Sequence, residues 1–173
     1  MKNRIVILVN IVILLAFCTQ VAGQRKTGPA GTVGSTAADF SLINLNGEEV
    51  TLEQYRGKVI LLNFWASWCA PCKIEIPDFI RMYEKHREDG LEIIGITLSS
   101  GSVAEIRQFV QAWNINYPIL TGDEKYLQDL TLKYDGIRGV PTTFLIDREG
   151  KIRQKWIGAR TEKIFMAEVE NYL

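Results

Sequence analysis

Two cysteines separated by two residues carry the clearest chemical signal in the sequence. They stand in the segment Trp68-Cys69-Ala70-Pro71-Cys72, between an apolar run and a predicted helix. A cysteine at a helix N-terminus is stabilised as a thiolate by free backbone N–H groups and by the helix dipole. Because only the thiolate attacks a disulfide, this position activates Cys69. Cys72 lies one helical turn further on, close enough to bond to Cys69.

Thiol–disulfide exchange is the chemistry that this placement predicts. Cys69 would attack the disulfide of a partner and form a mixed disulfide, which Cys72 would resolve by attacking Cys69. We expect Cys69 to be the exposed nucleophile with a depressed pKa. Cys72, one turn into the helix, is expected to be the more buried resolving thiol.

Two other uses of the cysteine pair stay open. An inert structural disulfide would be a poor constraint on the unfolded chain, because the loop that it closes is so short. A zinc or copper site would need more ligands, because two thiolates are only half of a tetrahedral zinc shell. The single histidine, His86, follows Cys72 by fourteen residues and is interpreted as a solvated helix residue. We therefore expect no metal and no cofactor.

Hydrophobic patterns predict the elements that position the pair. Residues 58–66 include a nearly continuous apolar run, which is typical of a buried central strand. Alternating strands and helices that end in a hairpin indicate an α/β domain with a mixed sheet covered on both faces, preceded by a short N-terminal hairpin. Further strands are predicted at residues 40–43, 50–52, 91–98, 117–120, 142–146 and 151–156, and helices at 70–87, 103–113, 125–134 and 161–173, the last with Thr161 as its N-cap.

The first 23 residues have the pattern of a secretory signal. Lys2 and Arg4 precede an apolar run over residues 5–17. This run is shorter than the roughly 20 residues that a bilayer-crossing helix needs. Cleavage is expected near Gly23, and an uncleaved membrane anchor is the alternative.

The signal is predicted to lead through a linker into one folded domain. Cys18 resembles the cysteine of a lipoprotein signal, but such cysteines follow a small residue and Phe17 is large. We interpret Cys18 as an ordinary residue of the apolar segment and keep lipidation as the alternative. Residues 24–38 are rich in small residues, which indicates a flexible tether. The folded domain is then expected over residues 39–173.

Composition and charge indicate a soluble globular protein and argue against a nucleic-acid binder. The chain has 173 residues, of which 47% are hydrophobic and 23% charged, as in an ordinary soluble globular protein. Twenty basic residues balance twenty acidic ones, and without residues 1–23 eighteen basic residues remain against twenty acidic. A nucleic-acid binder normally carries a basic excess that meets the phosphates. No nucleic-acid partner is expected.

Two motifs resemble the thioredoxin superfamily. The first is the strand at residues 59–66 followed by Ser67 and the cysteine segment, and the second is residues 139–147, which are similar to the superfamily's cis-proline segment. Together they resemble most closely the TlpA/ResA-like group of extracytoplasmic thiol–disulfide oxidoreductases, over about residues 33–173. The resemblance implies a thioredoxin fold and a site of action in a bacterial periplasm or at the outer face of the cell membrane.

The resemblance also implies roles for single residues. Pro141 would be the cis-proline opposite the cysteines, and the backbone of Val140 would pair with the extended chain of a substrate, which Trp68 would also contact. Glu75, one turn beyond the cysteine pair, would transfer protons or tune the cysteine pKa; a solvated helix acid is the alternative. Asn63 stands where cytoplasmic thioredoxins have a buried aspartate, so that proton acceptor is missing.

Disulfide-bearing extracytoplasmic proteins are the partners that the resemblance implies, with apocytochrome c among them and a membrane thiol donor as the electron source. Membrane anchoring would run through residues 5–17. Two other functions compete with this reading. A peroxiredoxin-like peroxidase would need a threonine three residues before its reactive cysteine, where this chain has Ala66. A copper-binding carrier of the same fold would use a wider cysteine spacing and a distant histidine.

Overall fold

The structure, a computed structural model, describes residues 31–173. The predicted signal over residues 1–23, including Cys18, and the first part of the predicted linker lie outside the described residues. Within the described part, no helix has the length and apolar character that crossing a membrane requires.

A seven-stranded mixed sheet forms the centre of the domain, with the strand order β2-β1-β5-β4-β3-β6-β7. Strands β3, β4 and β5 are parallel to one another, and every other neighbouring pair is antiparallel. The predicted N-terminal hairpin extends the sheet by pairing β1 with β5. The strands are β1 (Ser41–Asn44), β2 (Glu49–Thr51), β3 (Val59–Trp65), β4 (Leu91–Thr97), β5 (Ile119–Thr121), β6 (Thr142–Ile146) and β7 (Ile152–Ile157).

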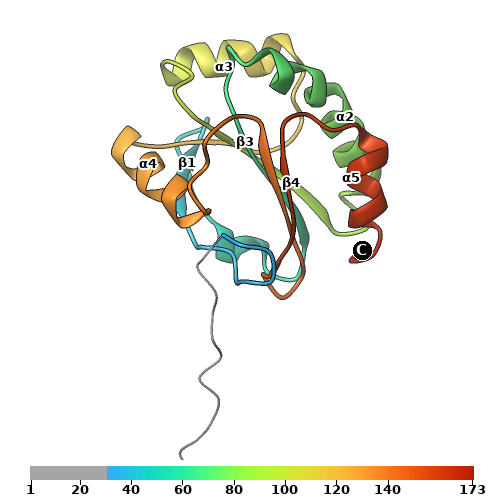
Figure 1. Cartoon of the computed structure of the whole chain (residues 1–173). Helices are drawn as coiled ribbons and strands as arrows, with labels where there is room; N and C mark the ends of the chain where they lie inside the picture. The colour runs from blue at the N-terminus through green and yellow to red at the C-terminus, as the bar shows by residue number, and fades with distance from the viewer. Residues whose placement is uncertain (1–30) are drawn as a thin grey trace, which may run out of the picture.

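Helices cover both faces of this sheet, as predicted for the α/β class (Figure 1). Three helices pack on one face: α2 (Ala70–His86), α3 (Val103–Ala112) and α5 (Glu162–Val169). The other face carries α4 (Glu124–Lys133) and the short 3-10 helix η1 (Leu52–Tyr55). The predicted boundaries agree with the structure within two residues, except at the C-terminal helix, which ends at Val169 rather than residue 173.

Strand β3 explains how the core places the cysteine segment. All seven of its residues are buried, and successive side chains point to opposite faces of the sheet. Leu61 belongs to the same hydrophobic cluster as Phe79 of α2, whereas Leu62 belongs to the cluster that contains Leu130 of α4. Because the strand is fixed from both faces, its carboxyl end at Trp65 holds the following residues at a defined edge of the sheet.

The predicted flexible linker is wrong for residues 31–38. Ser35 and Ala37 are buried, and Gly34 and Ala37 donate backbone hydrogen bonds to Ile152 (2.7 Å) and Gly150 (2.9 Å). Ile152 in turn donates to the carbonyl of Ser35 at 2.9 Å. This segment is held by backbone hydrogen bonds to the β6–β7 hairpin, and most of its side chains are small. The hydropathy of the sequence therefore does not indicate that the segment is ordered.

Helix α5 is capped from another helix. Thr161 is at the predicted N-cap position, but its side chain makes no capping hydrogen bond. The Oδ2 atom of Asp78, in α2, accepts the hydrogen bond from the Glu162 N–H at 2.7 Å instead. Arg81 then pairs with the carboxylates of both Asp78 and Glu162. The start of α5 is therefore tied to the helix that carries the cysteines.

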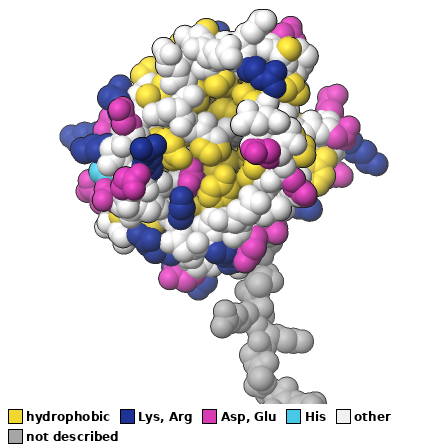
Figure 2. All heavy atoms as spheres, turned by 180° about the vertical axis from the view of Figure 1, so that it is seen from behind, with side chains coloured by type: hydrophobic (Ala, Val, Ile, Leu, Met, Phe, Trp, Pro, Cys, Tyr) yellow, Lys and Arg dark blue, Asp and Glu magenta, His cyan; other side chains and the backbone are white. Residues whose placement is uncertain are grey.

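On the side of the molecule seen in Figure 2, basic and acidic side chains alternate around an exposed hydrophobic area. Neither sign of charge dominates this side, in keeping with the equal numbers of basic and acidic residues in the chain. A surface of this kind lacks the continuous basic stripe that follows a nucleic-acid backbone.

Candidate active site

A disulfide joins Cys69 and Cys72 at the start of α2, where the two Cα atoms lie 5.3 Å apart. Cys69 is the N-cap residue of the helix, and its sulfur accepts a hydrogen bond from the backbone N–H of Cys72 at 3.2 Å. Pro71 occupies the first turn, where a missing N–H costs no helix bond. The predicted place of Cys69 at the helix N-terminus is confirmed, and an N–H there stabilises negative charge on its sulfur.

The predicted exposure of Cys69 is wrong for the disulfide form. Cys69 is 4% exposed and Cys72 is 2% exposed, so burial hardly distinguishes them. The sulfur of Cys69 is covered because it lies 3.5 Å from the carbonyl oxygen of Val140, on the loop before β6. Position along the helix, rather than exposure, is what makes the two cysteines different.

The loop that covers Cys69 contains the predicted cis-proline. The peptide bond between Val140 and Pro141 is cis, as expected, and Pro141 is buried at the entrance to β6. The Oγ1 of Thr142 donates to the carbonyl of Gly139 at 2.7 Å and fixes the turn. Among residues 31–173, no backbone acceptor faces the N–H of Val140. That N–H can therefore donate to an incoming chain.

Trp68 stands at the surface immediately before Cys69. Its side chain is 63% exposed, although its indole N–H donates to the carbonyl of Ser99 at 2.9 Å. The backbone N–H of Ser67 donates to the hydroxyl of Ser100 at 3.1 Å. The loop after β4 thus holds the residues on the N-terminal side of the disulfide and leaves an aromatic face open beside it.

Glu75 is buried, so the alternative of a solvated helix acid is wrong. It is 1% exposed, because this side of α2 packs against the sheet and the segment before α5. Its Oε1 accepts a hydrogen bond from the backbone N–H of Arg160 at 3.3 Å, and its Oε2 has no partner within the described chain. Burial raises the pKa of Glu75 to about 8, although the hydrogen bond and the charge of Arg160 oppose the shift. At neutral pH this carboxyl group holds a proton.

Asn63 is buried in the middle of β3, next to β6. Its side-chain amide donates to the hydroxyl of Thr143 at 2.9 Å across the antiparallel pair. Unlike a carboxyl group, this amide has no proton to release at ordinary pH. Glu75 is therefore the buried carboxyl group that lies nearest in sequence to the two cysteines.

His86 lies at the far end of α2 from the cysteines. Its Nδ1 is 3.1 Å from a carboxylate oxygen of Asp89, and its side chain is 15% exposed, so it is a half-buried helix residue rather than a fully solvated one. Within residues 31–173, no three His, Cys, Asp or Glu side chains come together as metal ligands would.

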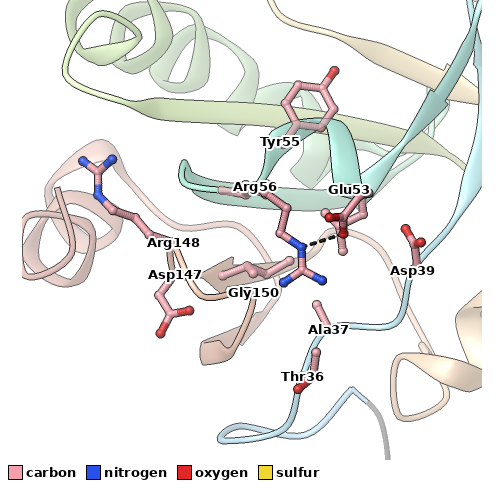
Figure 3. A pocket seen from close by; sticks show the side chains of 12 residues that line it. Thr36, Ala37, Asp39, Glu53, Tyr55, Arg56, Asp147, Arg148 and Gly150 are labelled. Carbon is pink, nitrogen blue, oxygen red and sulfur yellow. Dashed lines mark hydrogen bonds and ion pairs between the residues drawn. The ribbon is translucent and has the colours of Figure 1, made fainter.

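A small pocket opens at the opposite end of the sheet (Figure 3). Arg56 reaches across it and pairs with Glu53 at 2.6 Å, while Arg148 donates to the backbone carbonyls of Gly57 and Leu173. Its volume of about 30 Å³ leaves room for water rather than for a substrate. Both arginine side chains are already paired with groups of the protein itself, and the pocket is too small for a substrate. We therefore do not consider it a candidate active site.

Sequence reasoning missed three contributors to the site. Ser99 and Ser100 hold Trp68 and Ser67, and the backbone of Arg160 holds Glu75. The serines follow a predicted parallel strand, and the carboxyl ends of such strands are where functional loops gather. No local pattern marks Arg160, because its contribution is a backbone N–H brought in by the β7–α5 connection.

A thioredoxin-type oxidoreductase is the class that the fold and the cysteine site define. Residues 33–155 match the AhpC/TSA family. The chain is 31% identical over 177 residues to "Thiol-disulfide oxidoreductase ResA" of Bacillus thuringiensis subsp. konkukian, covering 99% of this chain and 96% of the relative. It is 34% identical over 168 residues to the protein of the same name from Geobacillus thermodenitrificans, with coverages of 97% and 93%. The chain belongs to the AhpC/TSA family and, within it, to the ResA-type thiol–disulfide oxidoreductases.

Solved structures show the same fold. A "putative Thiol:disulfide interchange protein DsbE" from Chlorobium tepidum superposes with a TM-score of 0.73 at 29% identity, covering 82% of this chain and 97% of that one. StoA from Bacillus subtilis gives a TM-score of 0.63 at 29% identity, with coverages of 75% and 95%. The predicted thioredoxin fold and the predicted enzyme class are both confirmed.

Proposed function

We propose that this oxidoreductase works outside the cytoplasm as a reductant of protein disulfides, with apocytochrome c among its substrates. The signal-like pattern of residues 1–23 supports export. The names of the ResA relatives support the chemistry. The observation that carries the proposal is Cys69 at the N-cap of α2, with its sulfur facing the N–H of Cys72.

The reaction begins from the dithiol form. The Cys69 thiolate attacks one sulfur of the substrate disulfide, and the other substrate sulfur leaves as a thiolate that takes up a proton. The Cys72 thiolate then attacks the Cys69 sulfur, which releases the second substrate thiol and forms the Cys69–Cys72 disulfide. Two electrons have passed to the substrate, and a membrane thiol donor returns the enzyme to the dithiol form.

The surrounding residues take the supporting roles in this proposal. The backbone of Val140, presented by Pro141, hydrogen-bonds the extended substrate chain beside its disulfide. The exposed ring of Trp68 contacts the substrate. Glu75 is protonated at neutral pH and tunes the proton balance of the cysteine thiols through the helix that they share.

Trapping of mixed disulfides tests the division of labour between the two cysteines. The Cys72→Ser variant should accumulate covalent complexes with exported proteins, because nothing resolves the bond that Cys69 forms. The Cys69→Ser variant is the matched control and should trap almost none. All complexes should disappear when a reductant is added, and mass spectrometry identifies the trapped proteins.

Each result of this experiment bears on a different part of the proposal. Cytochrome c precursors among the trapped proteins would support the maturation role, and their consistent absence would remove it. Equal trapping by the two variants would show that the roles of the cysteines are assigned wrongly. If neither variant traps a protein and the wild type reduces no protein disulfide, the reductase proposal fails.

A further inference from the structure

A crevice of about 530 Å³ opens at the carboxyl ends of β4 and β5, beside the disulfide but separate from it. Its walls come from the loops that follow these two strands and from the facing sides of α3 and α4. Its lining includes the side chains of Ser99, Ile106, Glu124, Leu127, Gln128 and Thr131.

The two chain connections that border this crevice lead to opposite faces of the sheet. Strand β4 leads into α3, which packs on the face of the sheet that α2 covers, and the neighbouring parallel strand β5 leads into α4 on the opposite face (Figure 1). Where adjacent parallel strands send their chains to opposite faces, the sheet leaves an opening outside the strand ends. In open α/β sheets, ligands bind at such points.

The loop after β4 joins the crevice to the active site. The carbonyl of Ser99 accepts the indole N–H of Trp68, and the hydroxyl of Ser100 accepts the N–H of Ser67. Ser99 also has a φ of 46°, a left-handed conformation that a residue other than glycine rarely adopts and that is found often at functional sites. The same loop therefore lines the crevice and contacts the residues next to Cys69.

The lining of the crevice carries no positively charged side chain. The lining combines the hydroxyl and amide groups of Ser99, Gln128 and Thr131 with the apolar side chains of Ile106 and Leu127. Among the residues that line the crevice there is no lysine or arginine, and the one charged side chain is the carboxylate of Glu124. Such a surface suits a polypeptide with polar, apolar and basic side chains, and it offers no counter-charge to a carboxylate or phosphate.

We propose that this crevice binds the stretch of polypeptide that flanks the disulfide of a protein substrate, and that Glu124 favours a basic side chain in that stretch. The inference rests on the proposed reductase function and adds a substrate-selecting site to it. Electron transfer itself stays at the two cysteines, and the crevice contributes only binding.

Cyclic peptides, each closed by one disulfide, provide the test. Lysine, alanine or glutamate is placed in turn at each of the positions flanking the cysteines, and the pre-reduced enzyme is mixed with each peptide. Each turnover converts one enzyme dithiol and one peptide disulfide into one enzyme disulfide and one peptide dithiol. The rate constant for each peptide is divided by that for bis(2-hydroxyethyl) disulfide, a probe too small to span both the cysteines and the crevice.

Glu124→Lys is compared with Asp129→Lys, which makes the same charge change on an exposed position of the same helix that does not line the crevice. At one or more flanking positions, the wild type should prefer lysine over glutamate by roughly threefold to tenfold, and Glu124→Lys should abolish or reverse this ratio. Asp129→Lys should keep the wild-type ratio. Gln128→Trp fills the crevice without changing charge. For every peptide, it should lower the rate constant relative to that for bis(2-hydroxyethyl) disulfide.

Two negative results are distinguishable. If the wild type reduces the peptides with no charge preference, and Glu124→Lys and Gln128→Trp both keep its ratios, the crevice is not a substrate site and the reductase function stands. If the wild type reduces bis(2-hydroxyethyl) disulfide but no peptide at all, the reductase proposal for protein substrates fails and the crevice inference fails with it.

Discussion

The backbone N–H of Arg160 donates to the carboxyl group of Glu75 across 85 residues of sequence, at 3.3 Å. This hydrogen bond connects the chain that enters α5 with the helix that carries the cysteines. It also leaves the second carboxyl oxygen of Glu75 without a partner in the described chain. An uncompensated buried carboxyl group stays protonated more easily than an exposed one, which ties both stability and reactivity to pH.

The first prediction concerns stability and pH. Burial raises the pKa of Glu75 from 4.5 to about 8, so the folded protein keeps a proton that the unfolded chain releases. The stability contributed by this group is fully present below about pH 4.5 and is lost as the pH rises through about 8. Glu75→Gln should therefore become more stable relative to the wild type as the pH rises from 5 to 9, by up to about 4 kcal/mol in the free energy of unfolding. Denaturant unfolding at several pH values measures this.

The same substitution should change the reactivity of the cysteines. In the reduced wild type, the rate of alkylation of Cys69 should follow the ionisation of Glu75 as well as that of the thiol, because both groups lie on the first two turns of α2. Glu75→Gln should shift this pH profile, whereas Glu84→Gln, at an exposed position of the same helix, should not. Identical profiles for all three proteins from about pH 5 to 9 would leave Glu75 with a structural role alone.

Asp78 is predicted to stabilise the start of α5. Its carboxylate replaces the missing side-chain cap of Thr161, so Asp78→Ala should lower the free energy of unfolding by about 1–2 kcal/mol. Asp129→Ala, an exposed position on α4, serves as the control and should have almost no effect. Equal stabilities of the two variants would mean that water caps α5 as well as Asp78 does.

The N-terminal boundary of the folded domain can be tested by truncation. A chain that begins at Gly31 should unfold cooperatively and keep its redox activity, because it retains every contact of residues 31–38 with the β6–β7 hairpin. A chain that begins at Asp39 loses the hydrogen bonds of Gly34, Ser35 and Ala37 and should be less stable by about 2–3 kcal/mol. Thermal or denaturant unfolding decides between this boundary and one at residue 39.

Gly95 is predicted to be a position where a larger side chain destabilises the fold. A Cβ atom there would lie 2.6 Å from the Cδ1 of Ile119 and 2.9 Å from the indole nitrogen of Trp65, at the end of β3. Gly95→Ala should lower the free energy of unfolding by about 1–3 kcal/mol through overpacking. At Gly139 nothing lies within 4 Å of such an atom, so Gly139→Ala is the control. A Gly95→Ala protein as stable as this control would refute the close packing.

The sequence was sufficient to predict those parts of the molecule that depend on interactions between neighbouring residues. The apolar run of β3, the helix that starts at Cys69 and the cis bond before Pro141 follow from residue types at short range, or from motifs made of neighbouring residues. The same holds for the pairing of Cys69 with Cys72, since one helical turn separates them.

The features that the sequence did not predict have a common physical origin in contacts made over long sequence distances. The burial of Glu75 depends on Arg160, the cap of α5 depends on Asp78, and the order of residues 31–38 depends on the edge of β7. Each partner is a backbone group or a side chain that hydropathy does not register. The cover over Cys69 is of the same kind, because it comes from the carbonyl of Val140.

The antiparallel bridge between Thr36 and Lys151 places the N-terminal segment of the domain at one end of the sheet, and the disulfide lies at the other end. Strand β6 starts beside the disulfide at Thr142 and ends at the turn that residues 31–38 contact. The chain therefore enters the domain at the end of the sheet opposite the disulfide. A five-residue strand spans about 17 Å. The disulfide therefore lies about the length of this strand away from the segment through which the chain enters the domain.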